Sequence, residues 1–254
     1  MASSSFRLRP AILLFGDSIT QHAFGVNGEV GWGSLLASSY ARRADVLERG
    51  YFGYSTAHAL DILPRVFGEK ASASSKQEIL FCTVLFGSND AVLPGTTGQH
   101  VPVEQYGENI AKIVAGIRER VLGESPTREF PIILLTPPPV DEVAWKTFKH
   151  LPTSNRTNQR ARMYGDRVKQ VAKDLHCPVI DTWELLEGNS DERSKYLADG
   201  LHLQENGNRL IYQAVMDLIR NQYPKLAPMA DDDGEGKYGS SGIPVEEKLW
   251  GELC

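Results

Sequence analysis

Three residue types that together carry acyl-transfer chemistry stand at opposite ends of the chain. Ser18 lies in Gly16-Asp17-Ser18, directly after an apolar run at 11–15, and Asp199 precedes His202 by three residues. At this spacing a carboxylate can hold one imidazole nitrogen and fix the tautomer, so that the other nitrogen faces a serine hydroxyl. The residues therefore predict a nucleophilic serine with a histidine base.

Two further polar motifs could stabilise a developing oxyanion. Gly53 follows Gly50 in a glycine-containing segment, where a backbone N–H can approach a ligand closely. Asn89 lies in Gly87-Ser88-Asn89-Asp90, where a side-chain amide can donate without titrating. Taken singly, each motif also fits an ordinary turn or helix cap. Only the occurrence of all these motifs in this order favours a catalytic function. Asp17 is interpreted mainly as a turn residue.

The elements that must position these side chains alternate along the chain. Short apolar runs predict buried parallel strands at Ala11–Phe15, Asp45–Arg49, Ile79–Phe86, Pro131–Thr136 and Pro178–Asp181. Apolar positions at helical spacing predict helices at Gly33–Ala44, Val103–Leu122, Gln159–Leu175 and Asn206–Tyr223. This alternation predicts an α/β fold, a three-layer α/β/α sandwich with about five parallel strands. Ligands bind beyond the carboxyl ends of such strands, which is where the polar motifs fall.

The four segments in this order resemble the GDSL, or SGNH, hydrolase family over Ile12 to about Tyr223. The resemblance implies a flavodoxin-like fold and serine esterase activity. It also implies a catalytic set of Ser18, Asp199 and His202 and an oxyanion hole formed by Ser18, Gly53 and Asn89. The expected substrate is a small-molecule ester with a small to medium acyl group, for example an acetyl ester.

Within this family the chain is most similar to the isoamyl acetate-hydrolysing esterase branch. The similarity is carried by Leu14-Phe15-Gly16-Asp17-Ser18-Ile19-Thr20, Arg49-Gly50 through Gly53-Tyr54, Thr136-Pro137-Pro138-Pro139 and Asp199-Gly200-Leu201-His202. The chain departs from it at His58, where relatives often carry tryptophan, and this departure concerns the acyl pocket and the choice of substrate.

Two other functions remain open at this stage. One is deacetylation of an acetylated carbohydrate, for which Trp32 could line the site, although a buried packing role fits this residue better. The other is a catalytically silent binding module, because a fold does not determine a function. The intact set of Ser18, Gly53, Asn89, Asp199 and His202 argues against the silent module.

Composition narrows the range of partners. The chain has 254 residues and a net charge of −5, so no basic face for nucleic acid is expected. No apolar stretch approaches the ~20 residues of a membrane span, and the absence of a signal-like segment favours a cytoplasmic location. Three widely spaced cysteines, Cys82, Cys177 and Cys254, suggest neither disulfides nor a zinc site. No cofactor is expected, and a homo-oligomer is left open.

The composition changes after Tyr223. We expect one hydrolase domain over residues 1–228, followed by an acidic Gly/Ser-containing linker and a short C-terminal segment over 229–254. Gly234-Glu235-Gly236-Lys237-Tyr238-Gly239 matches a GxGxxG string, but it follows three aspartates rather than a strand. Dinucleotide binding is therefore not expected there.

Overall fold

The computed structural model describes residues 8–68, 77–123, 128–187, 190–228, 231–232 and 237–238. Its centre is a five-stranded, fully parallel sheet in the order β2-β1-β3-β4-β5. The strands are β1 (Ala11–Gly16), β2 (Asp45–Gly50), β3 (Ile79–Leu85), β4 (Ile132–Leu135) and β5 (Val179–Ile180). All five predicted strands are confirmed, although β5 is shorter than its apolar run suggested.

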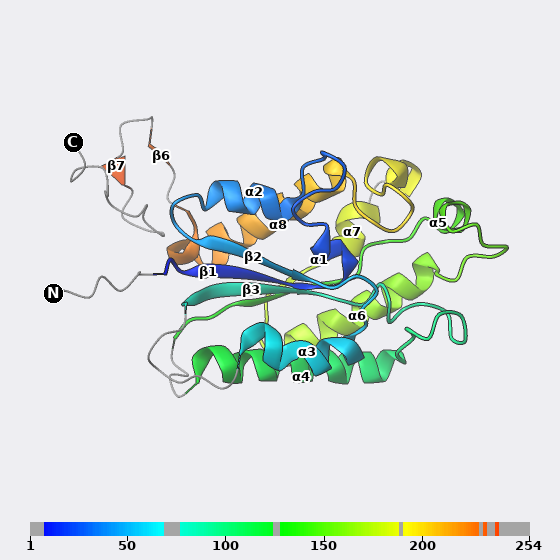
Figure 1. Cartoon of the computed structure of the whole chain (residues 1–254), viewed down its shortest axis with the longest axis horizontal. Coiled ribbons are helices and arrows are strands. Elements are labelled where there is room, and N and C mark those ends of the chain that lie inside the picture. Colours follow the sequence, from blue (N-terminus) through cyan, green and yellow to red (C-terminus); the bar gives the residue numbers. More distant parts are fainter. Residues whose placement is uncertain are drawn as a thin grey trace.

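Helices cover both faces of this sheet, as Figure 1 shows. One layer holds α2 (Trp32–Ser39) and α8 (Glu205–Gln222), and the other holds α3 (Thr56–Phe67), α4 (Val103–Leu122) and α6 (Asn158–Asp174). Shorter helices lie towards the carboxyl ends of the strands: α1 (Ser18–Gln21), α5 (Glu142–Phe148) and α7 (Thr182–Glu187). The predicted three-layer α/β/α sandwich is confirmed.

Each face of the sheet has its own hydrophobic core. Phe15, Phe86 and Tyr106 belong to the cluster that packs against α3, α4 and α6. Trp32 belongs to the opposite cluster and is 0% exposed, so its packing role is confirmed and it does not line a carbohydrate site. Because parallel strands are buried on both faces, β1 reads as an unbroken apolar run with all six residues buried. The edge strand β2 is only half-buried, which is why its pattern is weaker.

Besides the four-residue α1, three helices were missed by the sequence patterns. The longest, α3, has buried Ala59, Leu63 and Phe67 at spacings of four residues, although Pro64 lies within it. The other two, α5 and α7, are seven and six residues long, which is too short for helical periodicity to stand out. Conversely, the helix predicted over Gly33–Ala44 ends at Ser39.

The register of the central strands brings three separate motifs to one edge. Gly16 at the end of β1 lies beside Gly50 of β2 and Leu85 of β3. The polar segments that follow these strands therefore start at the same level of the sheet. A Cβ at Gly50 would lie 1.9 Å from the backbone nitrogen of Gln21, so glycine at this position lets β2 run close beside α1.

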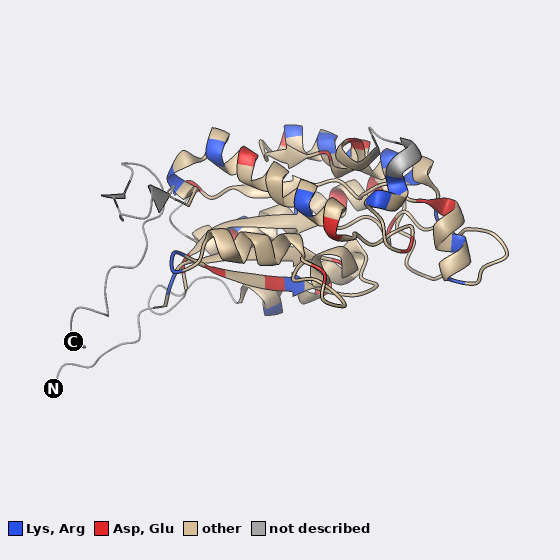
Figure 2. Cartoon of the chain, turned by 90° about the horizontal axis from the view of Figure 1, so that it is seen from above, with Lys and Arg blue, Asp and Glu red and all other residues tan. Residues whose placement is uncertain are grey.

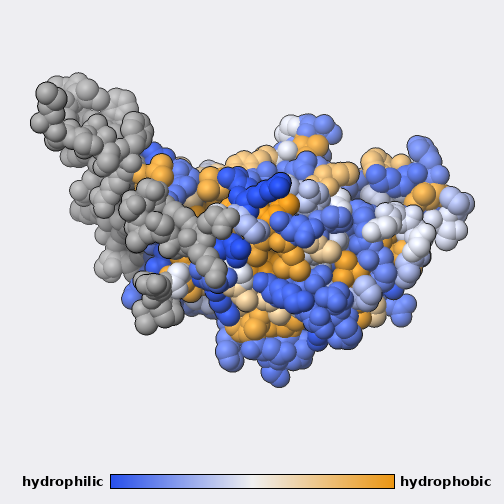
Figure 3. Space-filling view, turned by 60° about the horizontal axis from the view of Figure 1, so that its bottom comes forward, coloured by the Kyte–Doolittle hydropathy of each residue, from blue (hydrophilic) through white to orange (hydrophobic). Residues whose placement is uncertain are grey.

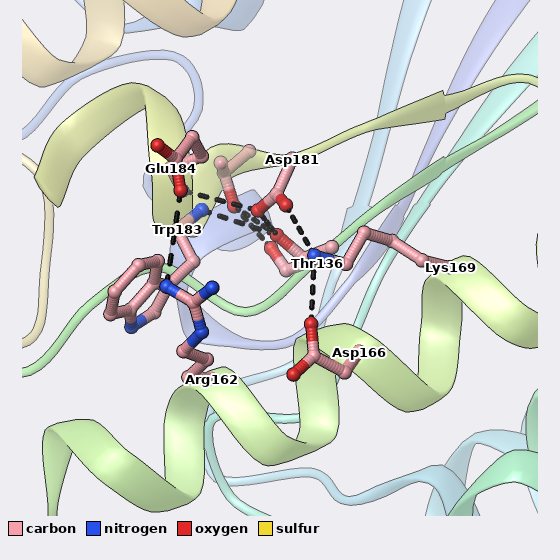
Figure 4. Close-up of polar contacts among 8 residues, drawn as sticks. Thr136, Arg162, Asp166, Lys169, Asp181, Trp183 and Glu184 are labelled. Carbon is pink, nitrogen blue, oxygen red and sulfur yellow. Dashed lines mark hydrogen bonds and ion pairs between the residues drawn. The ribbon is translucent and has the colours of Figure 1, made fainter. Parts of the chain in front are cut away.

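Polar contacts fix the other half of the sheet, as Figure 4 shows. The Thr136 hydroxyl, at the end of β4, donates to the Asp181 carboxylate after β5 at 3.2 Å. Lys169 of α6 donates to the same carboxylate at 2.7 Å and pairs with Asp166 at 2.8 Å. These contacts tie α6 to the ends of β4 and β5, from which the segments leading to the candidate site depart.

The described surface carries both signs of charge. Acidic and basic residues are interspersed along the helices in Figure 2, and hydrophobic side chains form separate patches among hydrophilic ones on the face in Figure 3. Within the described ranges no helix is long and apolar enough to cross a membrane. Cys82 and Cys177 are buried free thiols. Of the predicted tail, only the paired strands β6 (Asp231–Asp232) and β7 (Lys237–Tyr238) are described; the rest, with Cys254, lies outside the described residues.

Candidate active site

The predicted nucleophile, base and orienting carboxylate form one hydrogen-bonded chain. The Ser18 Oγ lies 2.9 Å from the His202 Nε2, and the His202 Nδ1 lies 2.6 Å from the Asp199 Oδ2. Ser18 is 4% exposed and His202 is 9% exposed, so little water competes for these contacts. The geometry therefore brings together side chains 184 positions apart in the sequence, in the arrangement that base-assisted attack by a hydroxyl requires.

Ser18 owes its position to the turn that ends β1. The fully buried Asp17 is the N-cap of α1, and its carboxylate accepts the Ile19 N–H at 2.9 Å. Ser18 is the first residue of this helix, where the backbone N–H has no partner within the helix. The interpretation of Asp17 as a turn residue is confirmed, and the Ser18 N–H is left pointing away from the helix body.

A second tight turn holds His202. The Asp199 Oδ1 accepts the backbone N–H groups of Leu201 and His202 at 2.9 and 2.8 Å, and Gly200 has a φ of +90°, a value that favours glycine. Burial raises the pKa of Asp199, but the hydrogen bond and charge of His202 and these backbone groups outweigh it, and the net pKa lies below its ordinary value. Asp199 is thus held as a carboxylate against the ring.

Gly53 occupies a turn that frees its backbone donor. The Tyr54 N–H donates to the Tyr51 carbonyl at 3.1 Å, and Gly53 has a φ of +78°. This φ is typical of the third residue of a type II turn, whose own N–H the turn does not use. Gly53 lines the same cavity as Ser18, as an oxyanion donor would have to.

Asn89 is held by contacts on both atoms of its amide. The Nδ2 donates to the Tyr54 carbonyl at 2.9 Å, which uses one of its two hydrogens. The Oδ1 accepts from Arg156 Nη2 at 2.9 Å and from Gln99 Nε2 at 3.3 Å. The adjacent Asp90, which the sequence left without a role, accepts the Thr56 backbone N–H at 2.9 Å and so joins the start of α3 to this loop.

These residues surround a cavity of about 300 Å³. Its apolar wall is made by Phe52, Trp145, Leu151 and Leu201. Its polar lining, besides Ser18, Gly53, Asn89 and His202, comes from Thr97, Gln99, Lys149, Asn155 and Arg156. All the predicted site residues line it except Asp199, which contacts His202 from behind. The arrangement offers a small, mostly apolar chamber with a hydroxyl nucleophile on its wall.

Aromatic rings surround the His202 side chain. The Phe52 ring stacks on His202 at 6.2 Å between centroids, and the Trp145 ring meets it edge-on at 6.1 Å. The His22 ring lies 5.1 Å away, and burial, followed by the charge of His202, lowers the pKa of His22. His22 therefore favours the neutral form beside the base.

The expectation that His58 concerns the acyl pocket is not supported. His58 is an exposed residue in the first turn of α3, where its Nδ1 accepts the Ser55 backbone N–H at 3.2 Å and lies 3.0 Å from the Ser55 hydroxyl. It is not among the residues that line the cavity. The departure from the family pattern at His58 therefore affects a helix cap.

Several residues around the site gave no recognisable signal in the sequence. Arg156 is only 5% exposed, and it precedes α6 in a segment with no strand or helix pattern. Gln99 lies in the loop after β3, and Trp145 lies on α5. Their positions depend on long-range packing, which a local motif does not encode. Asn155-Arg156-Thr157 reads only as a glycosylation sequon.

Replacing Asp17 by asparagine is expected to flatten the pH dependence of stability. Burial raises the pKa of Asp17 to about 6, against the opposing effects of the Ile19 N–H and of His202 and Arg156. Since this value exceeds that of the unfolded chain, the protonated form stabilises the fold at low pH, and that contribution is lost as pH rises through about 6. Between pH 5 and pH 8 the wild type should lose about 1 kcal/mol more than Asp17→Asn.

Urea denaturation of both proteins at pH 5 and pH 8 measures this difference. Asparagine can still accept the Ile19 N–H, so the cap of α1 is preserved in the variant. Equal losses of unfolding free energy in the two proteins would contradict the assignment.

No cluster of three or more potential metal ligands occurs among the described residues. The hydrogen-bonded groups of the site are a hydroxyl, an imidazole, a carboxylate and an amide, which is the set used for acyl transfer.

The chain belongs to the GDSL-like lipase/acylhydrolase family, whose model matches residues 14–210. It is 38% identical over 225 residues to the GDSL esterase/lipase At5g62930 of Arabidopsis thaliana, covering 85% of this chain and 88% of that protein. It is also 37% identical over 242 residues to the isoamyl acetate-hydrolyzing esterase 1 homolog of Rattus norvegicus, covering 93% of each. These matches identify the chain as a carboxylic-ester hydrolase of this family.

Solved structures share the fold at lower identity. The lipase/acylhydrolase from Enterococcus faecalis has a TM-score of 0.60 and 23% identity, with 84% of this chain and 96% of that chain covered. Axe2, an acetylxylan esterase from Geobacillus stearothermophilus, has a TM-score of 0.61 and 18% identity, with 84% and 94% covered. Both likenesses support the three-layer fold.

Proposed function

We propose that the chain is a serine esterase that hydrolyses carboxylic esters of small to medium size through an acyl-enzyme intermediate. The observation that carries this proposal is the chain of contacts from the Ser18 Oγ through His202 to Asp199 at the wall of the cavity. A catalytically silent binding module would not need these hydrogen bonds. Their presence therefore favours an enzyme.

In the proposed mechanism His202 Nε2 takes the Ser18 proton while Oγ forms a bond to the ester carbonyl carbon. The carbonyl oxygen becomes an oxyanion, which accepts hydrogen bonds from the Ser18 and Gly53 N–H groups and the free Nδ2 hydrogen of Asn89. Collapse breaks the bond to the alcohol oxygen, and His202 returns the proton to the departing alcohol. Water then attacks the acyl-enzyme with His202 again as base, releasing the acid and restoring Ser18.

The cavity limits the part of the substrate that lies beside Ser18, and a larger substrate would extend through its open side. Because a water molecule accounts for ~30 Å³ of liquid, a cavity of about 300 Å³ holds an ester of roughly ten heavy atoms. Phe52, Trp145, Leu151 and Leu201 provide apolar contacts for the acyl or alkyl group. The name of the rat relative, an isoamyl acetate-hydrolyzing esterase homolog, supports an acetyl ester of an apolar alcohol.

A second candidate substrate is an acetylated carbohydrate. The polar side chains of Thr97, Gln99 and Asn155 on the cavity wall could bind sugar hydroxyls, and the fold is shared with the acetylxylan esterase Axe2. Trp32 does not contribute, because it is fully buried.

Active-site labelling combined with a panel of esters tests the proposal. A fluorophosphonate probe should label Ser18 covalently, and a peptide carrying the adduct identifies the residue by mass spectrometry. Alkyl acetates and butyrates should be hydrolysed faster than acetylated xylan. Faster release of acetate from xylan would favour the second candidate, and an unlabelled, inactive protein would refute both.

A further inference from the structure

We propose that Arg156, assisted by Gln99, is a positioning residue that fixes the orientation of the Asn89 amide in the oxyanion hole. This inference rests on the proposed esterase function. In this role, Arg156 and Gln99 turn the amide nitrogen of Asn89, rather than its oxygen, towards the substrate.

The orientation of Asn89 is a chemical problem, because its two amide atoms have similar shape and opposite polarity. With the amide reversed, the Oδ1 would face the developing oxyanion and repel it. A guanidinium has only donors, so it can face only the Oδ1. Arg156 Nη2 lies 2.9 Å from this oxygen, and the Tyr54 carbonyl, which can only accept, lies 2.9 Å from the Nδ2, so the two contacts together determine which way the amide points.

Arg156 is itself held in place by its surroundings. Its Nη1 donates to the Ser88 carbonyl, the residue directly before Asn89. Its guanidinium carbon lies 5.2 Å from the centre of the Trp145 ring, a cation–π contact. Burial lowers the pKa of Arg156 to about 10, against the charges of Asp17, Asp199 and Asp90, so it remains a cation at neutral pH. The guanidinium is thus a fixed, charged donor.

Gln99 joins the two oxyanion segments. Its Nε2 donates to the Gly53 carbonyl at 2.8 Å and lies 3.3 Å from the Asn89 Oδ1. Because the Gly53 carbonyl can only accept, this contact turns the Gln99 nitrogen towards the site, and the Gln99 Oε1 on the other side accepts from the Thr97 hydroxyl at 2.8 Å. One amide therefore links the Gly53 turn to Asn89.

The Asn89 Nδ2 has one hydrogen available for a substrate. One of its hydrogens goes to the Tyr54 carbonyl, in the turn that contains Gly53. With the Oδ1 occupied by Arg156 and Gln99, the remaining Nδ2 hydrogen is the donor left for an oxyanion. A role limited to packing would require the bulk of Arg156 but no donor directed at the Asn89 Oδ1.

A double-mutant cycle between Arg156→Met and Asn89→Ala tests this inference. Methionine keeps much of the length of arginine but donates nothing. Alone it should lower kcat for an alkyl acetate by about 10²-fold, as a misplaced catalytic group does, with KM changed less than about threefold. Asn89→Ala alone should cost about 10²–10³-fold in kcat. In the Asn89→Ala background, Arg156→Met should cost less than about threefold more, because its target is gone.

Arg162→Met is the matched control. Arg162 also stacks on a tryptophan, Trp183, at 4.4 Å, but it lies outside the cavity and half of its side chain is exposed. The kcat of the Arg162→Met variant should stay within about twofold of that of the wild type. The inference would be overturned if the double variant lost kcat by the product of the two single losses, or if Arg156→Met left kcat unchanged. Either result would leave the proposed esterase function standing. A wild type without esterase activity would overturn both.

Gln99→Met provides a second variant should Arg156→Met fail to fold. Gln99 is a half-buried loop residue, so its replacement removes a donor at little cost to the core. We expect kcat to fall about tenfold in the wild type and to remain nearly unchanged in the Asn89→Ala background. Equal losses in both backgrounds would refute the role assigned to Gln99 and, in the absence of a folded Arg156 variant, the inference as a whole.

Discussion

Replacing Ser18 by alanine is expected to lower kcat for an alkyl ester on the order of 10⁶-fold, since losing the nucleophile of a serine triad removes nearly all covalent catalysis. The variant should lose labelling by a fluorophosphonate probe as well. Alanine keeps the Cβ and the backbone N–H at the start of α1, so the fold and the oxyanion donor should persist. Titration of the released acid measures kcat, and the thermal midpoint shows whether the fold persists.

Ser39→Ala serves as the control for a lost serine hydroxyl. The Ser39 Oγ lies 2.8 Å from the Tyr212 hydroxyl, in a contact between α2 and α8 remote from the cavity lining. Its kcat should match that of the wild type. A Ser18→Ala protein with undiminished turnover would end the proposed mechanism.

Asp199→Asn is expected to lower kcat by about 10⁴-fold without unfolding the protein. The amide can keep its oxygen towards the Leu201 and His202 N–H groups, as Asp199 Oδ1 does now. Its nitrogen would then face the His202 Nδ1 and donate to it. The ring proton would move to Nε2, the atom that must accept the proton of Ser18.

Steady-state kinetics and the thermal midpoint of Asp199→Asn check this expectation. Asp217→Asn on α8 is a matched control, because Asp217 is exposed and pairs with Arg220. Loss of activity in Asp199→Asn should appear in kcat with a thermal midpoint close to that of the wild type. Retention of more than a tenth of the wild-type kcat would show that the carboxylate does not set the tautomer.

Much of the fold could be predicted because buried parallel strands leave a clear pattern. The six-residue β1 and seven-residue β3 are almost wholly apolar. The helices α4, α6 and α8 have strong periodicity, and their predicted limits lie within one residue of those observed. Short α5 and α7 could not be found, since one or two turns do not establish a period.

The residues of the site also differ in how clearly the sequence indicates them. Ser18, Gly53, Asn89, Asp199 and His202 follow or precede recognisable elements, so the topology placed them at one edge of the sheet. Arg156 and Gln99 gave no such signal, because both lie in loops without a strand or helix pattern. The buried cation of Arg156 is stabilised by Ser88 and Asn89, which lie in a different loop, and no local motif encodes such contacts. The expectation that His58 concerns the acyl pocket is not supported, because its side chain contacts Ser55 at the start of α3 and does not line the cavity.

The distribution of the site along the chain has a consequence for biosynthesis. The proposed nucleophile and both proposed amide donors come from residues 18–89, whereas the proposed base is residue 202, just before α8. The helix α8 joins the body partly through Asn208, whose Oδ1 lies 3.3 Å from the Trp32 nitrogen at the start of α2. A growing polypeptide therefore cannot form the contacts that link Ser18, His202 and Asp199 until residue 202 has emerged from the ribosome.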